Sequence, residues 1–165
     1  MKTLVAIAFL VPHVMFAQTE PAMKQKAFEM MVGTLLSHSV AEVKVSDVQL
    51  SGVIVLDARE QKEFDVSHLP RAQWVGYDDF DLSRVALIPK DAPVMVYCSV
   101  GYRSEKIAER LIKAGFTHVT NLYGGIFAWS NAGHQVVDST DLATNRIHGY
   151  SRTWGIWLDS ADVVY

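Results

Sequence analysis

The residues of this sequence that could carry chemistry gather around its single cysteine, Cys98. Cys98 follows the apolar run 94–97 and begins a short segment that contains Gly101 and Arg103, ahead of an amphipathic stretch. A loop between a buried strand and a helix N-terminus can turn its backbone N–H groups inward and bind an anion. The same N–H groups and the helix dipole favour the thiolate form of a cysteine held there. The segment therefore predicts an activated nucleophile.

The predicted catalytic pair is Cys98 and Arg103. Arg103 adds a fixed positive charge and a planar fork that suits an oxyanion, so no separate base is needed. Five neighbouring residues are predicted to line the anion-binding loop: Ser99, Val100, Gly101, Tyr102 and Ser104. Of these, Tyr102 either contacts substrate or shields the site. The alternative is that Cys98 is a small buried hydrophobe, as free cysteines often are.

The elements that must position this loop alternate along the chain. Continuous apolar runs typical of strands buried on both faces occur at 53–56 and 94–97, with a weaker run at 119–122. Residues 104–114 have apolar side chains at helical spacing. This alternation predicts an α/β fold with a central parallel sheet and helices on both faces. Ligands bind beyond the carboxyl ends of such strands, which is where Cys98 falls.

Composition restricts the class of protein further. The chain has 165 residues, of which 50% are hydrophobic and 20% charged, enough for one domain with extensions and too apolar for a disordered chain. A net charge of −3 argues against nucleic-acid binding. One cysteine excludes an internal disulfide and every multi-cysteine metal site, and the five histidines other than His68 lack metal-ligand spacing. No metal and no organic cofactor are expected.

The N-terminus has the order of a secretory signal. Lys2 precedes the apolar run 4–11, and Ala17 offers a small residue for cleavage. We therefore expect a signal peptide at 1–17 and export, into a bacterial periplasm or an extracellular space. A buried N-terminal strand is the alternative. The run is too short for a membrane span, so no stable membrane insertion is expected.

Two further segments flank the predicted domain. Residues 18–42 form an N-terminal extension, with a helix predicted over 22–36. Residues 138–165 form a linker and an aromatic tail, in which Trp154, Trp157 and Leu158 share one face of a predicted helix. The tail is too apolar to stay in water, so we expect it to fold back on the domain. A homodimer contact through the same aromatic residues is the alternative.

Residues 43–137 resemble a rhodanese domain of the single-domain thiosulfate sulfurtransferase type. Four segments match in the family's order: Val55–Glu60, Glu63–Phe64 with His68–Leu69–Pro70, Tyr97–Ser104, and Gly124–Trp129. The sequence departs from the family pattern at Ser67 and Arg71, where glycine is usual.

The resemblance implies transfer of a sulfane sulfur through a Cys98 persulfide, from a donor such as thiosulfate to cyanide or a thiol. Four residues separate Cys98 from Arg103, whereas related phosphatases and arsenate reductases carry one residue more, so the resemblance favours sulfur over phosphate. By the same resemblance Arg103 steers the dianion and stabilises the departing sulfite. The alternative is a rhodanese-fold module that binds an oxyanion, or carries persulfide for a partner protein, without turnover.

Three more residues are predicted to support the site. Asp57 and Arg59 fall at the carboxyl end of a strand, where an ion pair bracing the loops is preferred over direct substrate contact. His68 lies in a turn and is expected to be a hydrogen-bonding bracket rather than a base.

Overall fold

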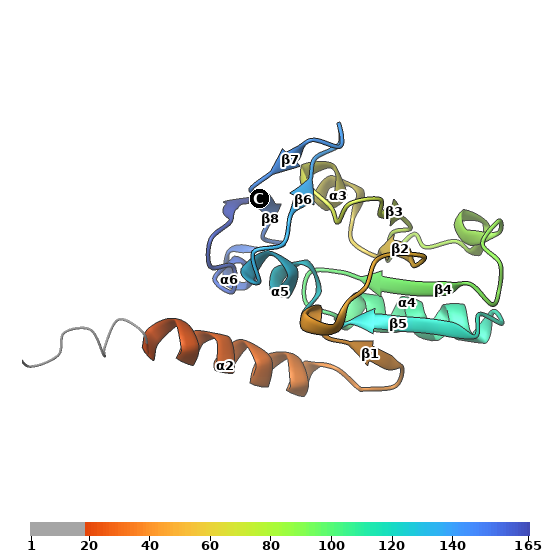
Figure 1. Ribbon diagram of the computed structural model, residues 1–165, viewed down its shortest axis with the longest axis horizontal. Helices are drawn as coiled ribbons and strands as arrows, with labels where there is room; N and C mark the ends of the chain where they lie inside the picture. Colours follow the sequence, from red (N-terminus) through yellow and green to blue (C-terminus); the bar gives the residue numbers. More distant parts are fainter. Residues whose placement is uncertain (1–18) are drawn as a thin grey trace, which may run out of the picture.

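The computed structural model describes residues 19–165, and its centre is a five-stranded parallel sheet (Figure 1). Every neighbouring pair of strands in this sheet is parallel. In spatial order the strands are β1 (Ala41–Val43), β5 (His118–Leu122), β4 (Pro93–Tyr97), β2 (Ile54–Asp57) and β3 (Gln73–Trp74). The predicted signal peptide at 1–17 lies outside the described residues.

Helices and two small strand pairs surround this sheet. The helices are α2 (Thr19–Leu35), α3 (Gln61–Val66), α4 (Tyr102–Lys113), α5 (Gly125–Asn131) and α6 (Arg152–Gly155), with short 3-10 turns at Val45–Asp47 and Leu82–Val85. An antiparallel pair joins β6 (Val136–Val137) to β7 (Ala143–Thr144), and a parallel pair joins β8 (Arg146–His148) to β9 (Asp162–Val164). No helix within residues 19–165 combines the length and the apolar character needed to span a bilayer.

The sheet is buried on both faces, which explains the unbroken apolar runs. Val55 and Leu56 are neighbours in β2, yet Val55 packs with α2 and α5 whereas Leu56 packs with α4. Successive side chains of a strand point to opposite faces, so both must be apolar when helices cover both sides. The predicted fold class, a central parallel sheet with helices on both faces, is confirmed.

The helix after the cysteine starts earlier than predicted. It begins at Tyr102 rather than Ser104, because Gly101 at φ 117° turns the chain and accepts the N–H of Glu105 at 3.0 Å. Only a residue without a Cβ adopts this φ readily. Tyr102 and Arg103 therefore lie in the first turn of α4 and not in a free loop.

A buried carboxylate joins α4 to the N-terminal helix. Glu105 is fully buried and accepts the backbone N–H groups of Ser37 and Ser39, each at 3.0 Å. These donors follow α2, whose observed range of Thr19–Leu35 is close to the predicted 22–36. The contact fixes the end of α2 beside the start of α4.

The C-terminal tail packs back on the domain as predicted, although its helix is shorter. Leu158 is buried in the same core cluster as Phe28 of α2, and the rings of Phe28 and Trp157 lie 5.8 Å apart. The helix α6 ends at Gly155, so Trp154 and Leu158 do not share one helical face. A Cβ on Gly155 would lie 3.1 Å from Val163 Cγ1, so β9 packs closely against the end of α6.

Candidate active site

Cys98 lies at the carboxyl end of β4, at the bottom of a small cavity. Its exposed fraction is 1%, so access to the thiol runs through this cavity, whose volume is about 150 Å³. Its walls come from the loop, from α4, from α2 and from the tail: Leu35, Cys98, Ser99, Val100, Tyr102, Arg103, Tyr150 and Trp154. The site is therefore a buried nucleophile beside one small, partly open cavity.

The loop backbone supports the sulfur. The N–H of Gly101 donates to Cys98 Sγ at 3.1 Å, next to the N-terminus of α4. Two buried polar side chains fix the position of Gly101. Asn121 Nδ2 donates to the carbonyl of Gly101 at 3.0 Å, and Ser104 Oγ donates to Asn121 Oδ1 at 2.7 Å. Both side chains are fully buried. The loop is thus held in place before any ligand arrives.

The start of α5 holds the loop from the other side. Ile126 donates its N–H to the carbonyl of Cys98 at 2.9 Å, and Phe127 donates to the carbonyl of Ser99 at 3.1 Å. Gly125 permits this approach, because a Cβ there would lie 2.3 Å from the Cys98 carbonyl oxygen. Gly125 therefore has a steric cause close to the nucleophile.

Arg103 faces a carboxylate, which changes its predicted role. Its Nη1 donates to Glu63 Oε2 at 2.7 Å and its Nη2 to Glu63 Oε1 at 2.9 Å, while Nη2 also reaches Ser99 Oγ at 2.9 Å. The fork expected to hold an oxyanion is filled by Glu63. Arg103 still lines the cavity, but in this structure it braces the loop against α3.

Arg103 and Glu63 carry opposite charges. Burial raises the pKa of the Glu63 carboxyl, but its hydrogen bonds to Arg103 and the positive charges of Arg103 and Arg59 outweigh burial. The net result is a pKa below the ordinary value of 4.5. Burial lowers the pKa of Arg103 while Glu63 and Cys98 raise it, and the net shift is upward. Both groups are therefore ionised at neutral pH and neutralise each other.

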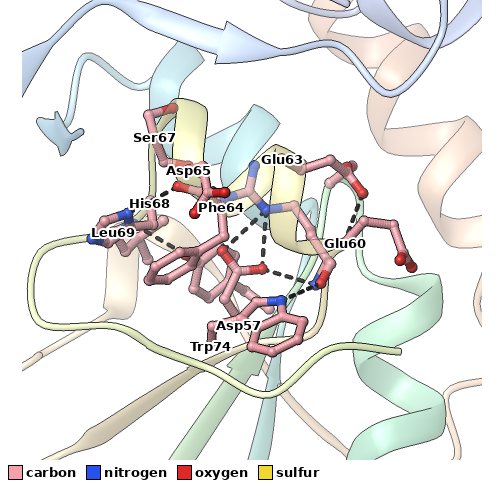
Figure 2. A network of polar contacts seen from close by, with 12 residues as sticks. Asp57, Glu60, Glu63, Phe64, Asp65, Ser67, His68, Leu69 and Trp74 are labelled. Atoms are coloured by element: carbon pink, nitrogen blue, oxygen red, sulfur yellow. Dashed lines mark hydrogen bonds and ion pairs between the residues drawn. The ribbon is translucent and has the colours of Figure 1, made fainter. Parts of the chain in front are cut away.

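Asp57 and Arg59 form the buried ion pair that the sequence favours over substrate contact. Arg59 Nη2 donates to Asp57 Oδ2 at 2.6 Å and to the carbonyl of Ser67 at 2.6 Å. Trp74 Nε1 donates to the Arg59 carbonyl at 2.8 Å, and Figure 2 shows Asp57, Trp74 and Ser67 around this network. Neither Asp57 nor Arg59 lines the cavity. The pair ties β2 and β3 to the turn after α3.

His68 braces the next turn. Its Nδ1 lies 3.1 Å from the Phe64 carbonyl, and its ring stacks on Phe64 with centroids 3.9 Å apart (Figure 2). Arg71, at a usual glycine position, keeps a left-handed φ of 64°, while Ser67 has an extended φ of −171° that any residue adopts. The turn therefore forms without the usual glycines.

The structure adds to the site five residues that the sequence analysis did not place there. Glu63 and Asn121 hold the loop, and three residues complete the cavity wall: Leu35, Tyr150 and Trp154. A polar Asn inside the apolar run 119–122 was a detectable signal, whereas the wall residues lie outside the segment that resembles the family. Among residues 19–165 no cluster of three or more metal-binding side chains occurs.

Comparisons with known proteins agree on one family. Residues 41–132 match the family model described as "Rhodanese-like domain". The chain is 32% identical over 107 residues to a sulfurtransferase of Allochromatium vinosum, covering 65% of this chain and 96% of that protein. It is 30% identical over 93 residues to thiosulfate sulfurtransferase GlpE of Coxiella burnetii, covering 56% and 84%.

The fold agrees as well. The solution structure of a rhodanese-like domain from Anabaena superposes with a TM-score of 0.55 at 20% identity, covering 59% of this chain and 78% of that one. At this identity the likeness bears on the fold alone.

Proposed function

This chain belongs to the rhodanese family, and from that premise we propose that it is a sulfurtransferase that carries sulfane sulfur on Cys98 as a persulfide. The observation that carries the proposal is the 3.1 Å hydrogen bond from the Gly101 N–H to Cys98 Sγ, in a small cavity open to solvent. A donor so placed stabilises a sulfur anion without any change of the loop. The relatives named sulfurtransferases support the same reaction class.

The proposed reaction has two displacements. The Cys98 thiolate attacks the outer sulfur of thiosulfate, the S–S bond breaks, and sulfite leaves with the electron pair. Cyanide or a thiolate then attacks the terminal sulfur of the persulfide, a reversible state of cysteine, and restores the thiolate. No metal or organic cofactor takes part in these steps.

The size of the loop supports sulfur over phosphate. Six residues run from Cys98 to Arg103, and the side chain of Arg103 is engaged by Glu63. Arginine–phosphate contacts are frequently bidentate, and in this site Glu63 already engages both Nη atoms of Arg103. A single sulfur atom on Cys98 adds no oxygens that require a free arginine fork.

Mass spectrometry of the intact protein tests the nucleophile. After incubation with thiosulfate, the protein should gain about 32 Da, one sulfur atom, and lose it again on addition of cyanide with release of thiocyanate. Cys98→Ser, which keeps the shape of the side chain, should gain nothing. Persulfide formation without thiocyanate release would instead support the alternative of a carrier module that does not turn over. Thiocyanate production by Cys98→Ser at the wild-type rate would refute the proposal.

We also propose export of the protein, supported by the order of Lys2, the apolar run 4–11 and Ala17. Fractionation of cells that express the full chain should recover a product shortened by the predicted 17 residues outside the cytoplasm. Leu10→Arg, which puts a charge into the apolar run, should remain unprocessed. Full-length protein in the cytoplasm for both forms would contradict export.

A further inference from the structure

Part of the wall around Cys98 comes from segments outside residues 41–132. We propose that Leu35, Tyr150 and Trp154, here named the specificity wall, select sulfur donors and acceptors that carry an apolar or aromatic group. This inference rests on the proposed sulfur transfer and names the substrate class of that site. Leu35 ends α2, whereas Tyr150 and Trp154 belong to the C-terminal tail.

Tyr150 is held at the cavity by specific contacts. Its backbone is left-handed at φ 61°, which is a strained conformation for a tyrosine. The buried His148 stabilises this turn by accepting the Tyr150 N–H on Nδ1 at 3.0 Å. The ring of Tyr150 then lies over the Arg103 guanidinium at 4.9 Å. Such strain gathers at ligand sites, and here the strained residue lines the cavity that also contains Cys98.

The other two members of the wall continue the apolar surface. Trp154 and Leu35 line the cavity over Cys98 and also a neighbouring hollow along α2. The remaining residues of that hollow are mostly apolar: Ala27, Met30, Met31 and Thr34. An organic group attached to the reacting sulfur can therefore leave the cavity along apolar side chains.

The charge of the cavity also favours a donor with an apolar or aromatic group over a small dianion. Arg103 is the one cationic residue among those that line it, and Glu63 neutralises its fork. The dianion thiosulfate gains no unpaired cation from these walls. A monoanionic thiosulfonate, R–SO2–S⁻, loses less solvation and places its R group on the specificity wall. An apolar cavity of this volume, about 150 Å³, has room for a benzene ring.

The transfer step with such a donor balances. The Cys98 thiolate attacks the sulfane sulfur of R–SO2–S⁻, and a new S–S bond forms. The bond between the two donor sulfurs breaks, and the sulfinate R–SO2⁻ leaves with its electron pair. One thiolate and one thiosulfonate thus give one persulfide anion and one sulfinate, and cyanide removes the outer sulfur as thiocyanate.

The test compares kcat/KM for benzenethiosulfonate and methanethiosulfonate, with cyanide as acceptor. Wild type should prefer the aromatic donor, and Tyr150→Ala and Trp154→Ala should each reduce that preference by about fivefold, the worth of one aromatic contact. The loss should fall mainly in KM for the aromatic donor. Ile156→Ala is the matched control, since Ile156 is in the same tail, 59% exposed and outside the cavity.

The outcomes separate this inference from the proposed function. A wild type that uses both donors equally, or alanine variants that keep the wild-type ratio, would overturn the specificity wall while sulfur transfer stands. A wild type that forms no persulfide with any donor overturns both. Circular dichroism and Tm establish that each variant is folded. If Trp154→Ala fails to fold, Tyr150→Ala and the donor preference of wild type still decide.

Discussion

Replacing Glu63 by glutamine isolates the ion pair that braces the catalytic loop. The Glu63 carboxylate is fully buried and accepts four hydrogen bonds: two from Arg103, one from Ser99 Oγ at 3.2 Å and one from the Glu60 N–H at 3.0 Å. Glutamine keeps one acceptor oxygen but turns an NH2 group toward the donors. Removing one partner of a buried pair costs about 3–5 kcal/mol.

We expect the lower end of that range, because Arg103 retains 12% exposure and can recruit some water. A loss of about 3 kcal/mol corresponds to a fall in Tm of about 6–12 °C for a chain of this size. Urea unfolding at pH 7, followed by the fluorescence of the four tryptophans, measures it. Glu60→Gln is the control, since its carboxylate is 4.0 Å from Arg103 and 38% exposed. That change should cost no more than about 0.5 kcal/mol.

The difference in unfolding free energy between wild type and Glu63→Gln should depend on pH. Because the folded pKa of Glu63 lies below its ordinary value of 4.5, its ionised form contributes stability at all pH values above 4.5. That contribution disappears as pH falls through the lowered folded pKa, where protonated Glu63 becomes neutral like glutamine. Wild type and Glu63→Gln should therefore converge in acid. Equal losses for Glu63→Gln and Glu60→Gln, or a difference that persists unchanged in acid, would refute the assigned role of the pair.

Three further changes test other contacts. Arg103→Lys keeps the charge but cannot make both hydrogen bonds to Glu63, so it should brace the loop less well and kcat/KM for thiosulfate should fall about tenfold with the persulfide still forming. Unchanged kinetics would show that this paired contact is dispensable. Gly125→Ala places a Cβ 2.3 Å from the Cys98 carbonyl oxygen at φ 55°. It should lower the free energy of unfolding in urea by about 2–3 kcal/mol and remove most of the activity. Gly52→Ala is the control: at φ 75° with open space around its Cβ, it should cost less stability and keep the activity. Truncation after Asp141 removes the buried Leu158 and both tail tryptophans, so the chain should lose several kcal/mol at every protein concentration; a change only in particle mass would indicate a dimer contact instead.

The sequence predicted those parts of the molecule that depend on local pattern. The unbroken apolar run at Val55–Leu56 indicates a strand covered on both sides, and Cys98 directly after such a strand falls at the ligand edge of the sheet. The partner of Arg103 was not predictable in this way. Glu63 is 40 residues away in the chain, and only the packing of α3 beside the loop brings the two together.

The tail shows the same division between local and distant causes. Its apolar content predicts that it packs on the domain, but the close approach of β9 to Gly155, where α6 ends, has no signature in the local pattern. The left-handed turn at Tyr150 depends on His148 and on the position of Arg103, and neither contact has a signature in the sequence around it. Such contacts are settled by tertiary packing, which overrides local propensity.

The position of the specificity wall has a consequence for synthesis. The wall residue Trp154 lies 56 positions after the nucleophile in the chain, and the strand β9, which pairs with β8 beside it, ends at Val164. Chains emerge from the ribosome with the N-terminus first. Cys98 is therefore synthesised well before Tyr150 and Trp154. A nascent or prematurely terminated chain that stops before Tyr150 carries the cysteine without these two wall residues.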